Sequence, residues 1–222
     1  MPFEPRRYRL WAFGLVLAWA SLAQAQCPAP EARLLLERFI PADCEACWRE
    51  GTPPTGAPAV LDWIVPSPRG EEAPLSAAAL PEARGRAGAL VADATLPRRH
   101  ALAAPASLRV AVLDGPAWNG YVGLQLQVQQ PGGVLPKGAV GYLALIENVA
   151  AGDEGTPVAR RLVRVLAGPL PLDPSQGTND HLRALRIPLG ARVERLGSVG
   201  WVESATGQVL AWAVAPVGDC DR

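Results

Sequence analysis

The chain has 222 residues, of which 49% are hydrophobic, and its 21 basic and 21 acidic residues give a formal net charge of zero. This apolar content excludes an intrinsically disordered chain, and the lack of basic excess argues against nucleic acid as a partner. The 22 glycines and 23 prolines fall between apolar segments, which indicates many short elements separated by turns.

The first 25 residues have the pattern of a secretory signal peptide. Three arginines precede an apolar stretch over residues 10–23, and Ala23-Gln24-Ala25 forms a cleavage site before Gln26. An uncleaved anchor is the alternative, but the stretch is short beside the roughly 20 residues of a membrane span. A lipid anchor on Cys27 is disfavoured because Gln26 replaces the small residue expected before such a cysteine. We therefore expect an exported chain, periplasmic or secreted, with no membrane span after cleavage.

Cleavage would leave 18 basic and 20 acidic residues, a formal charge of −2. It would also leave all four cysteines, Cys27, Cys44, Cys47 and Cys220, in the exported part. An even number in an oxidising compartment permits two disulfides in three pairings. The most economical pairing is Cys44–Cys47 with Cys27–Cys220, and the second bond would join the two ends of the mature chain.

The segment before residue 106 mixes strand and helix signals. Residues 33–40 fit a buried strand or a short helix, and Asp43 is a candidate N-cap for a short helix over 44–50. Residues 59–65 predict a second strand. Residues 75–92 are rich in alanine and leucine and predict an interrupted helix.

The segment after residue 106 predicts strands only. Residues 123–129, GLQLQVQ, alternate strictly between apolar and polar, as a half-buried strand does. Turn signals separate seven such candidates, over residues 108–113, 123–129, 139–148, 158–166, 181–189, 198–204 and 208–215. Short strands at this spacing are typical of an antiparallel β-sandwich, so a domain boundary is expected near residue 106.

The Cys44-x-x-Cys47 pair is the clearest candidate for chemistry. The order of strand, loop, cysteine pair and helix suits thiol–disulfide exchange, with Cys44 as the attacking and Cys47 as the resolving residue. Asp43 and Glu45 flank Cys44, and their negative charges should raise the pKa of its thiol. A purely structural disulfide is the alternative.

Metal and haem chemistry have less support. Haem attachment would need a histidine where Trp48 stands, and zinc would need two ligands beyond the cysteines. The only histidines, His100 and His181, lie on opposite sides of the expected boundary. We expect neither a metal nor a cofactor.

Residues 33–48, RLLLERFIPADCEACW, resemble the opening of a family of uncharacterised exported thioredoxin-like proteins of Gram-negative bacteria, with Glu37, Phe39, Cys44 and Cys47 at the matching positions. Residues 141–168, which contain Leu162-Val163-Arg164, and residues 199–213, which contain Thr206-Gly207-Gln208-Val209, resemble later parts of the same family. The resemblance implies a thioredoxin-like α/β part followed by a β-rich part.

The chain also departs from this family. Trp48 and Arg49 stand where typical members have two prolines, and only Asp62-Trp63 echoes their aromatic and acidic cluster. The cis-proline that thioredoxin-like sites use would be Pro97 or Pro105. The α/β part is short for a thioredoxin domain and is expected to be trimmed.

These observations predict an α+β protein: a signal peptide over 1–25, a short thioredoxin-like α/β domain over 26–106, and an immunoglobulin-like antiparallel β-sandwich over 107–222. The predicted function is thiol–disulfide exchange with protein partners through Cys44 and Cys47. The alternative is a non-catalytic, disulfide-stapled periplasmic protein for binding or envelope assembly. The oligomeric state is left open.

Two other groups of residues were considered as ligand sites. Arg160, Arg161 and Arg164 could bind an anion, but we expect them on the solvated face of a strand. The tryptophans could line a cleft but are expected in the core: Trp48, Trp63, Trp118, Trp201 and Trp212.

Overall fold

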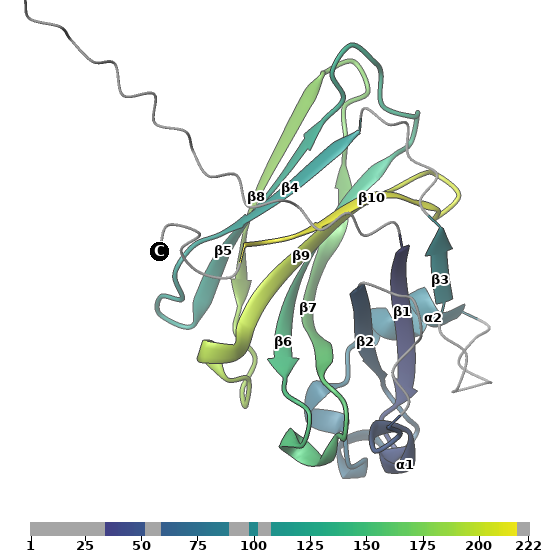
Figure 1. Cartoon of the computed structure of the whole chain (residues 1–222), viewed down its shortest axis with the longest axis vertical. Coiled ribbons are helices and arrows are strands. Elements are labelled where there is room, and N and C mark those ends of the chain that lie inside the picture. The colour runs from purple at the N-terminus through teal and green to yellow at the C-terminus, as the bar shows by residue number, and fades with distance from the viewer. Residues whose placement is uncertain (1–33, 52–58, 89–97, 102–107, 217–222) are drawn as a thin grey trace, which may run out of the picture.

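The computed structural model describes residues 34–51, 59–88, 98–101 and 108–216. The predicted signal peptide, the predicted Cys27–Cys220 disulfide, and Pro97 and Pro105 all lie outside these residues. Within them, ten strands form two sheets (Figure 1).

The larger sheet has seven strands. Their order is β10 (Val209–Val214), β9 (Leu196–Glu203), β6 (Val140–Val149), β7 (Arg160–Pro171), β2 (Ala59–Val65), β1 (Leu34–Pro41) and β3 (Arg98–Ala101). The smaller sheet has the order β4 (Arg109–Asp114), β5 (Tyr121–Gln129) and β8 (Thr178–Arg186).

The larger sheet is mixed, because β1 pairs with β2, and β2 with β7, in parallel, while its other pairs are antiparallel. The β2–β7 pairing rests on one residue pair, Asp62 with Leu162, whereas β6 and β7 pair along most of their length. We call this narrow junction between β2 and β7 the seam. Everything on the β1 side of the seam comes from the first half of the chain.

Two short α-helices cover opposite faces of the larger sheet near the seam. Helix α1 (Glu45–Trp48) packs through Trp48 in a cluster with Ile40 and Ile64, and α2 (Pro81–Ala87) packs through Ala83 and Ala87 in a cluster with Trp63. Because both faces are covered, β1 and β2 are apolar on both sides, as their sequences are. The described residues also contain four 3-10 turns: η1 (Gly70–Glu72), η2 (Ser76–Ala78), η4 (Asp153–Gly155) and η5 (Val193–Arg195).

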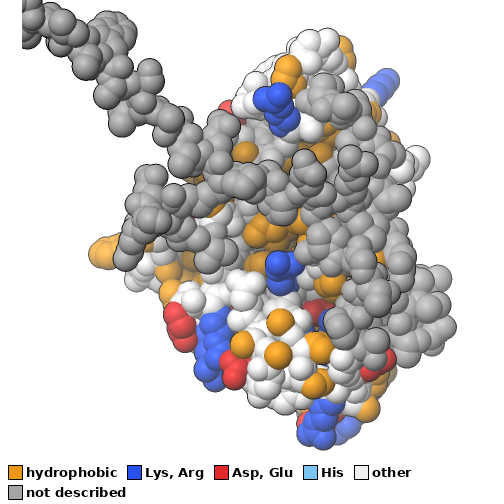
Figure 2. Space-filling view, in the orientation of Figure 1, with side chains coloured by type: hydrophobic (Ala, Val, Ile, Leu, Met, Phe, Trp, Pro, Cys, Tyr) orange, Lys and Arg blue, Asp and Glu red, His pale blue; other side chains and the backbone are white. Residues whose placement is uncertain are grey.

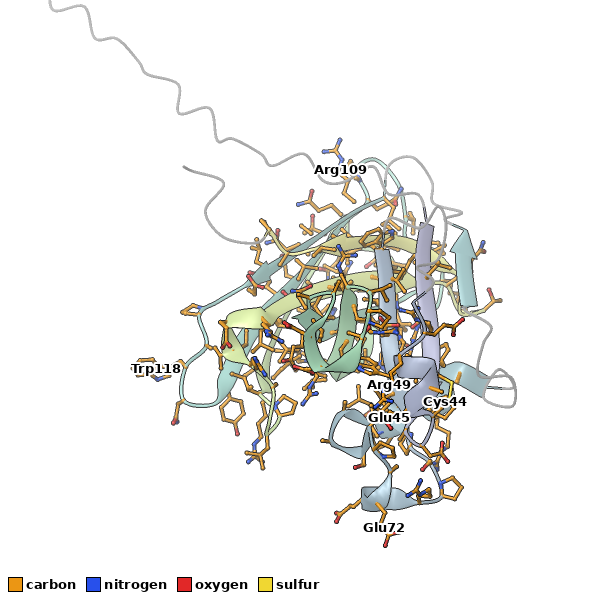
Figure 3. All side chains as sticks on the ribbon, turned by 60° about the horizontal axis from the view of Figure 1, so that its bottom comes forward. Cys44, Glu45, Arg49, Glu72, Arg109 and Trp118 are labelled. Carbon is orange, nitrogen blue, oxygen red and sulfur yellow. A yellow bond between two sulfur atoms is a disulfide. The ribbon has the colours of Figure 1, made fainter. Side chains whose placement is uncertain are left out.

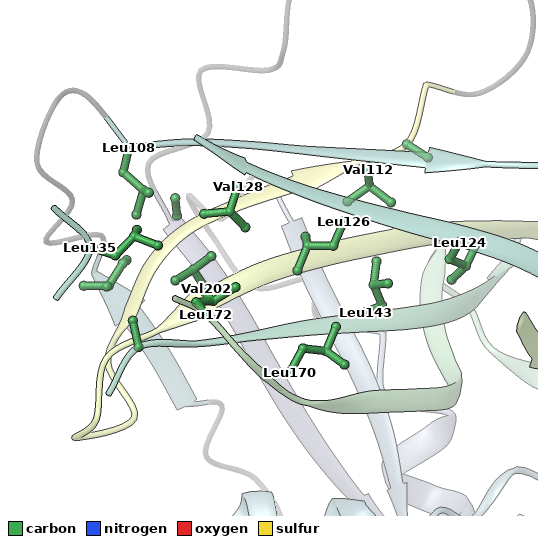
Figure 4. Packing of buried hydrophobic residues seen from close by; sticks show 14 of the residues in the cluster. Leu108, Val112, Leu124, Leu126, Val128, Leu135, Leu143, Leu170, Leu172 and Val202 are labelled. Carbon is green, nitrogen blue, oxygen red and sulfur yellow. The ribbon is translucent and has the colours of Figure 1, made fainter. Parts of the chain in front are cut away.

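The largest apolar cluster lies between the two sheets (Figure 4). Strand β5 buries alternate residues, among them Leu124 and Leu126, against residues of β6 and β7 such as Leu143 and Leu170. Gly200 on β9 permits the close approach, because a Cβ there would lie 2.6 Å from Val112 Cγ2 and 2.8 Å from Leu126 Cδ1. A side chain at this position would force the sheets apart.

This architecture corrects the predicted fold class. No separate thioredoxin-like α/β domain is present among the described residues, since β1, β2 and β3 continue the same sheet as β6, β7, β9 and β10. The second half is also not an independent antiparallel sandwich, because β7 adds a parallel neighbour, β2, from the first half. The fold is β-rich, with two sheets face to face and two short α-helices. Residue 106 as a boundary stays a prediction.

The individual elements agree better with the sequence. Residues 34–41 form a strand rather than a helix, β2 spans the predicted 59–65, and all seven predicted later strands are present with shifted ends. The predicted helix over 75–92 is reduced to η2 and α2 within the described residues. Strand β3 is not among the strands predicted from the sequence.

Candidate functional site

Cys44 and Cys47 form a disulfide, with their Cα atoms 5.3 Å apart, at the start of α1 (Figure 3). Both residues are half-buried. Cys44, not the predicted Asp43, is the N-cap residue, and the backbone N–H of Cys47 donates to its Sγ over 3.2 Å. One sulfur atom thus has a hydrogen-bond donor that would also favour a thiolate.

The charges around the disulfide work against a thiolate. Asp43 and Glu45 are exposed beside Cys44. Arg49, the nearest cation in sequence, pairs with Glu45 over 2.5 Å, and both side chains are more than half exposed. This pair leaves Asp43 as an uncompensated negative charge next to the attacking position.

Trp48 fixes the far end of α1. Its side chain is only 4% exposed and packs in a cluster with Ile40, Ala42 and Ile64. Its indole N–H donates to the carbonyl oxygen of Glu154, in η4, over 2.8 Å. The residue directly after Cys47 is therefore a core residue that connects the disulfide to the β6–β7 connection.

Arg160, the first residue of β7, contacts the C-terminal end of α1. Its guanidinium lies over the Trp48 ring, with Cζ 4.6 Å from the centroid, and Nη2 donates to the carbonyl oxygens of Trp48 and Glu50 over 2.5 and 3.2 Å. Nε donates to Thr156 Oγ1 over 2.6 Å. Arg160 thus satisfies backbone carbonyls at the C-terminal end of α1 that have no partner inside so short a helix.

Asp62, fully buried on β2, supplies the charge for this arginine across the seam. Its Oδ1 accepts from Arg38 Nε over 2.5 Å and lies 3.5 Å from Arg160 Nη1. Its Oδ2 has no hydrogen-bond partner in the described part of the chain. One carboxylate is therefore shared by two guanidinium groups, and Arg160 lies at the longer distance. Burial lowers the pKa of Arg160, and Asp62 opposes this effect only partly.

A second arginine, with its side chain 11% exposed, lies on the opposite face of the sheet. Arg86, in the last turn of α2, makes a two-point contact with Glu37 on β1, over 2.8 and 2.9 Å, and a third bond to Glu203 on β9, over 2.7 Å. Its Cζ lies 5.0 to 5.4 Å from the ring centroids of Trp63, Tyr142 and Trp201. Two carboxylates and three aromatic rings surround one cation.

The charge of Arg86 is compensated by its two carboxylate partners. Burial alone would lower the pKa of Arg86, but the charges and hydrogen bonds of Glu37 and Glu203 outweigh burial and raise it. Trp201 Nε1 also donates to Glu203 Oε1 over 2.7 Å. Tyr142 has a raised pKa, first because of burial and then because of the negative charge of Glu203. Arg86 fits a structural role, because its guanidinium is bonded to Glu37 and Glu203.

The expectation for the arginines of β7 was wrong for two of the three. Arg160 is 2% and Arg164 7% exposed, and only Arg161 is half-buried. Arg164 Nε lies 3.6 Å from Glu147 Oε2, so it too is a buried partner of an acid. A sequence signal did exist, since Glu37 and Asp62 stand inside apolar runs and a buried carboxylate needs a cation.

The expectation for the tryptophans holds with one exception. Trp48, Trp63 and Trp201 are buried and Trp212 is partly buried, but Trp118 is 82% exposed. Trp118 precedes Asn119-Gly120, a dipeptide typical of tight hairpin turns. That motif could have placed it at a hairpin tip.

The described residues contain no group of three or more His, Cys, Asp or Glu side chains that could hold a metal ion. His100 lies on β3 and His181 on β8, in different sheets. The cis peptide bond in the described part is Gly168–Pro169, on β7, and not at the disulfide. No helix among these residues is long and apolar enough to cross a membrane.

Two hollows lie away from the disulfide. The larger, of about 560 Å³, is lined by Ala117, Val193, Arg195 and residues of β6 and β9. The smaller, of about 380 Å³, is lined by Val60 and Arg160 among others. Asn148 and Arg161 line both, so the two hollows adjoin along β6 and β7.

No protein-family model and no curated protein matches this sequence. Two solved structures are similar in part. A domain of the outer membrane lipoprotein Omp28 from Porphyromonas gingivalis has a TM-score of 0.38 at 14% identity, over 52% of this chain and 92% of that one. HBP35 of Porphyromonas gingivalis has a TM-score of 0.46 at 12% identity, over 84% of this chain and 74% of that one. At these TM-scores the likenesses assign neither a fold family nor an activity to the chain.

Proposed function

We propose that the chain is a non-catalytic, exported envelope protein in which Cys44–Cys47 is a structural staple. The proposal rests on one observation: hydrogen bonds and packing hold the chain in place both before and after the disulfide. The Cys44 N–H donates to the carbonyl of Pro41, the last residue of β1, over 2.9 Å, and Trp48 is buried and bonded to Glu154 and Arg160. A disulfide in such a setting closes a turn whose two ends are already held.

The charges around the disulfide also support a structural role. A working exchange site needs a stabilised thiolate, which cations or a helix N-terminus of useful length supply. Here the flanking residues are acidic, the nearest arginine is engaged by Glu45, and α1 has only four residues. The exported location is supported by the signal-peptide pattern over residues 1–25, and an oxidising compartment would keep the staple closed.

The test is the reduction potential of the pair together with the stability of Cys44→Ala/Cys47→Ala. We expect a midpoint below about −300 mV, as structural disulfides have. Closure of a four-residue loop gives about 2 kcal/mol in the chain-entropy model, so the double variant should fold and lose about that much free energy of unfolding. A midpoint between about −120 and −270 mV would contradict the staple.

A second function, thiol–disulfide exchange with protein partners, is favoured by one observation. The Cys47 N–H donates to Cys44 Sγ, and both cysteines are partly accessible. In this chemistry a partner dithiol reduces the pair and is itself oxidised to a disulfide. The Cys44 thiolate then attacks a partner disulfide, forms a mixed disulfide and releases one partner thiolate. Cys47 displaces the second partner sulfur and restores the Cys44–Cys47 bond.

The two functions differ in what a single cysteine variant does. Exchange through Cys44 predicts that Cys47→Ala accumulates mixed disulfides with periplasmic proteins, while Cys44→Ala does not. A structural staple predicts that both variants lose similar stability and that neither enriches partners over the other. Non-reducing gels of the two variants, expressed at equal levels, separate these outcomes.

A further inference from the structure

Strand β8 forms one edge of the smaller sheet, and no strand of the described part of the chain pairs with its outer side (Figure 1). It has nine residues, more than the usual strand of about five or six. Its ladder with β5 runs from Thr178 to Arg186 without a bulge. The edge strands β4 and β10 pack against each other, and β3 has only four residues. Among the described strands, β8 thus presents the longest edge without a neighbour.

Alternate residues of β8 point their backbone groups away from β5. At one end of the ladder the Gly177 carbonyl accepts from the Gln130 N–H over 2.9 Å. At the other end the Ile187 N–H donates to the Gly120 carbonyl over 2.8 Å. Because residues of an antiparallel pair alternate in this role, the even-numbered residues of β8 direct their N–H and C=O groups outward. All five are exposed: Thr178, Asp180, Leu182, Ala184 and Arg186.

The side chains of these residues match those of a second, antiparallel copy of the strand. Asp180 and Arg186 lie on the same, solvent-exposed face of β8. If two copies of β8 pair about a two-fold axis at Arg183, Asp180 of each copy stands opposite Arg186 of the other. In the same register Leu182, which is 71% exposed, stands opposite Ala184. The strand is therefore complementary to itself in charge.

Neighbouring charges do not take part in this match. Both arginines of η5 pair with acidic residues of η4, and acidic and basic side chains lie side by side at the lower left of the space-filling view (Figure 2). Asp114 lies on β4, at the other edge of the smaller sheet, and accepts from Ser198 Oγ over 2.7 Å. Asp180, Arg186 and Glu194 form no ion pair within the described residues. Asp180 and Arg186 are thus available to a second copy.

Arg183 lies on the other face of β8 and would meet its own copy at the two-fold axis. Its side chain is exposed, and Nη1 donates to the Leu182 carbonyl over 2.8 Å. A carbonyl oxygen has two lone pairs, so this bond is compatible with a ladder bond to the same oxygen. Two like charges at opposite positions weaken a strand pair. Arg183 therefore limits the affinity of the association.

We propose that β8 pairs with β8 of a second copy of this chain and joins the two smaller sheets into one continuous sheet. Asp180, Leu182, Ala184 and Arg186 of each copy exchange backbone hydrogen bonds with the other. Two symmetric ion pairs between Asp180 and Arg186 fix the register. Because both copies use the same surface, the contact closes at two chains. The proposal does not depend on the role of Cys44–Cys47.

The test uses two charge reversals in the mature protein, Asp180→Arg and Arg186→Asp. Either one alone turns both ion pairs into pairs of like charge, so the dimer Kd from sedimentation velocity should rise at least about tenfold. An equimolar mixture of the two variants restores opposite charges at both positions, because the arginine at position 180 of one meets the aspartate at position 186 of the other. The mixture should therefore dimerise as the wild type does.

Two further variants complete the experiment. Arg183→Gln removes the like charges at the axis and should lower the dimer Kd. Arg109→Asp is the matched control, because Arg109 is an exposed arginine of the same sheet but lies on β4, at its other edge. It should leave the Kd unchanged. Circular dichroism and the urea midpoint of each variant establish that it is folded.

The proposal is overturned if the folded wild type sediments as a monomer up to about 1 mM. It is also overturned if the mixture of the two charge reversals stays as monomeric as each variant alone. A dimer that survives both reversals, or that Arg109→Asp weakens equally, would use another surface and would contradict the proposal as well.

Discussion

Two arginines, one on each face of the larger sheet, connect the two sides of the seam between β2 and β7. They differ in their acidic partners. Arg86 joins Glu37 on one side of the seam to Glu203 on the other, with two carboxylates for one cation. Arg160 reaches Asp62 across the seam, but Asp62 is shared with Arg38, and the closest partners of Arg160 are neutral oxygens.

This difference shows in the direction of the two pKa values. Burial favours a lower pKa in both arginines, but Glu37 and Glu203 reverse the effect for Arg86, whereas Asp62 does not for Arg160. Arg86 is therefore stabilised by its own ion pairs. Arg160 depends on the carbonyls of Trp48 and Glu50, and so on α1 keeping its shape. We infer that the disulfide and Arg160 support each other.

The largest expected effect is that of Arg86→Met. It leaves Glu37 and Glu203 buried without their shared cation, and loss of one member of a buried ionic group lowers the free energy of unfolding by about 3–5 kcal/mol. Urea denaturation measures this loss. Arg84→Met is the control, because Arg84 is on the same helix but exposed, and it should stay within about 0.5 kcal/mol. Equal losses in the two variants would contradict the ionic role of Arg86.

Arg160→Met should be milder, with a loss of about 1–3 kcal/mol, because Asp62 keeps Arg38 and mainly neutral hydrogen bonds disappear. Arg49→Met, which removes only an exposed ion pair on α1, serves as the control and should lose at most about 1 kcal/mol. If Arg160→Met destabilised the protein as much as Arg86→Met, the two sites would not differ as described.

A double-mutant cycle sharpens the comparison further. We expect Arg160→Met and Cys44→Ala/Cys47→Ala to couple by about 0.5–2 kcal/mol, because both act on the two ends of α1. The same cysteine variant combined with Arg86→Met should be additive within about 0.5 kcal/mol, since Arg86 lies on the other face. Stabilities of the six proteins under one set of urea conditions decide the matter. Equal coupling in both cycles would remove the link between the disulfide and Arg160.

The smallest expected effect concerns alkaline pH. The pKa of Tyr142 is raised in the folded protein, so its contribution to stability is complete below the ordinary tyrosine value of about 10 and is lost as pH rises through the folded value. Tyr142→Phe should therefore lose less stability than the wild type as pH rises above about 10. Tyr121→Phe, which removes a half-exposed hydroxyl group at the start of β5, is the matched control. Identical alkaline slopes in wild type and Tyr142→Phe would contradict this.

Local patterns predict much of this molecule. The alternation in residues 123–129 gives β5, and apolar runs give β1 and β2. The merged sheet could not be predicted, because one pair, Asp62 with Leu162, joins segments 100 residues apart and leaves no periodic signal. The buried arginines were missed for a related reason. Arg160 looks like a surface residue until the partner on β2 is known, although Asp62 within AVLDWIV was a sign that a cation would be needed.

Some features of the candidate site could also be predicted from local sequence, and others could not. The Cys44–Cys47 disulfide follows from spacing and compartment, and the structure contains it. The contacts that hold α1 could not be predicted from the sequence, because Glu154 and Arg160 lie more than 100 residues further along the chain. The exposed position of Trp118 could have been predicted in part, because Asn119-Gly120 after it is typical of a hairpin turn.

The narrow seam also divides the larger sheet into two parts that should differ in their resistance to local unfolding. Amide hydrogens of β6 and β9 lie in ladders with partners on both sides, and β7 pairs with β6 along most of its length, whereas β1 and β2 are held to these strands by one backbone pair and by side chains. Local opening follows such boundaries. The β1 and β2 amides should therefore exchange with solvent deuterium as one cooperative group, before the β6 amides. Substitution of an arginine that spans the seam should change the difference between the two exchange rates.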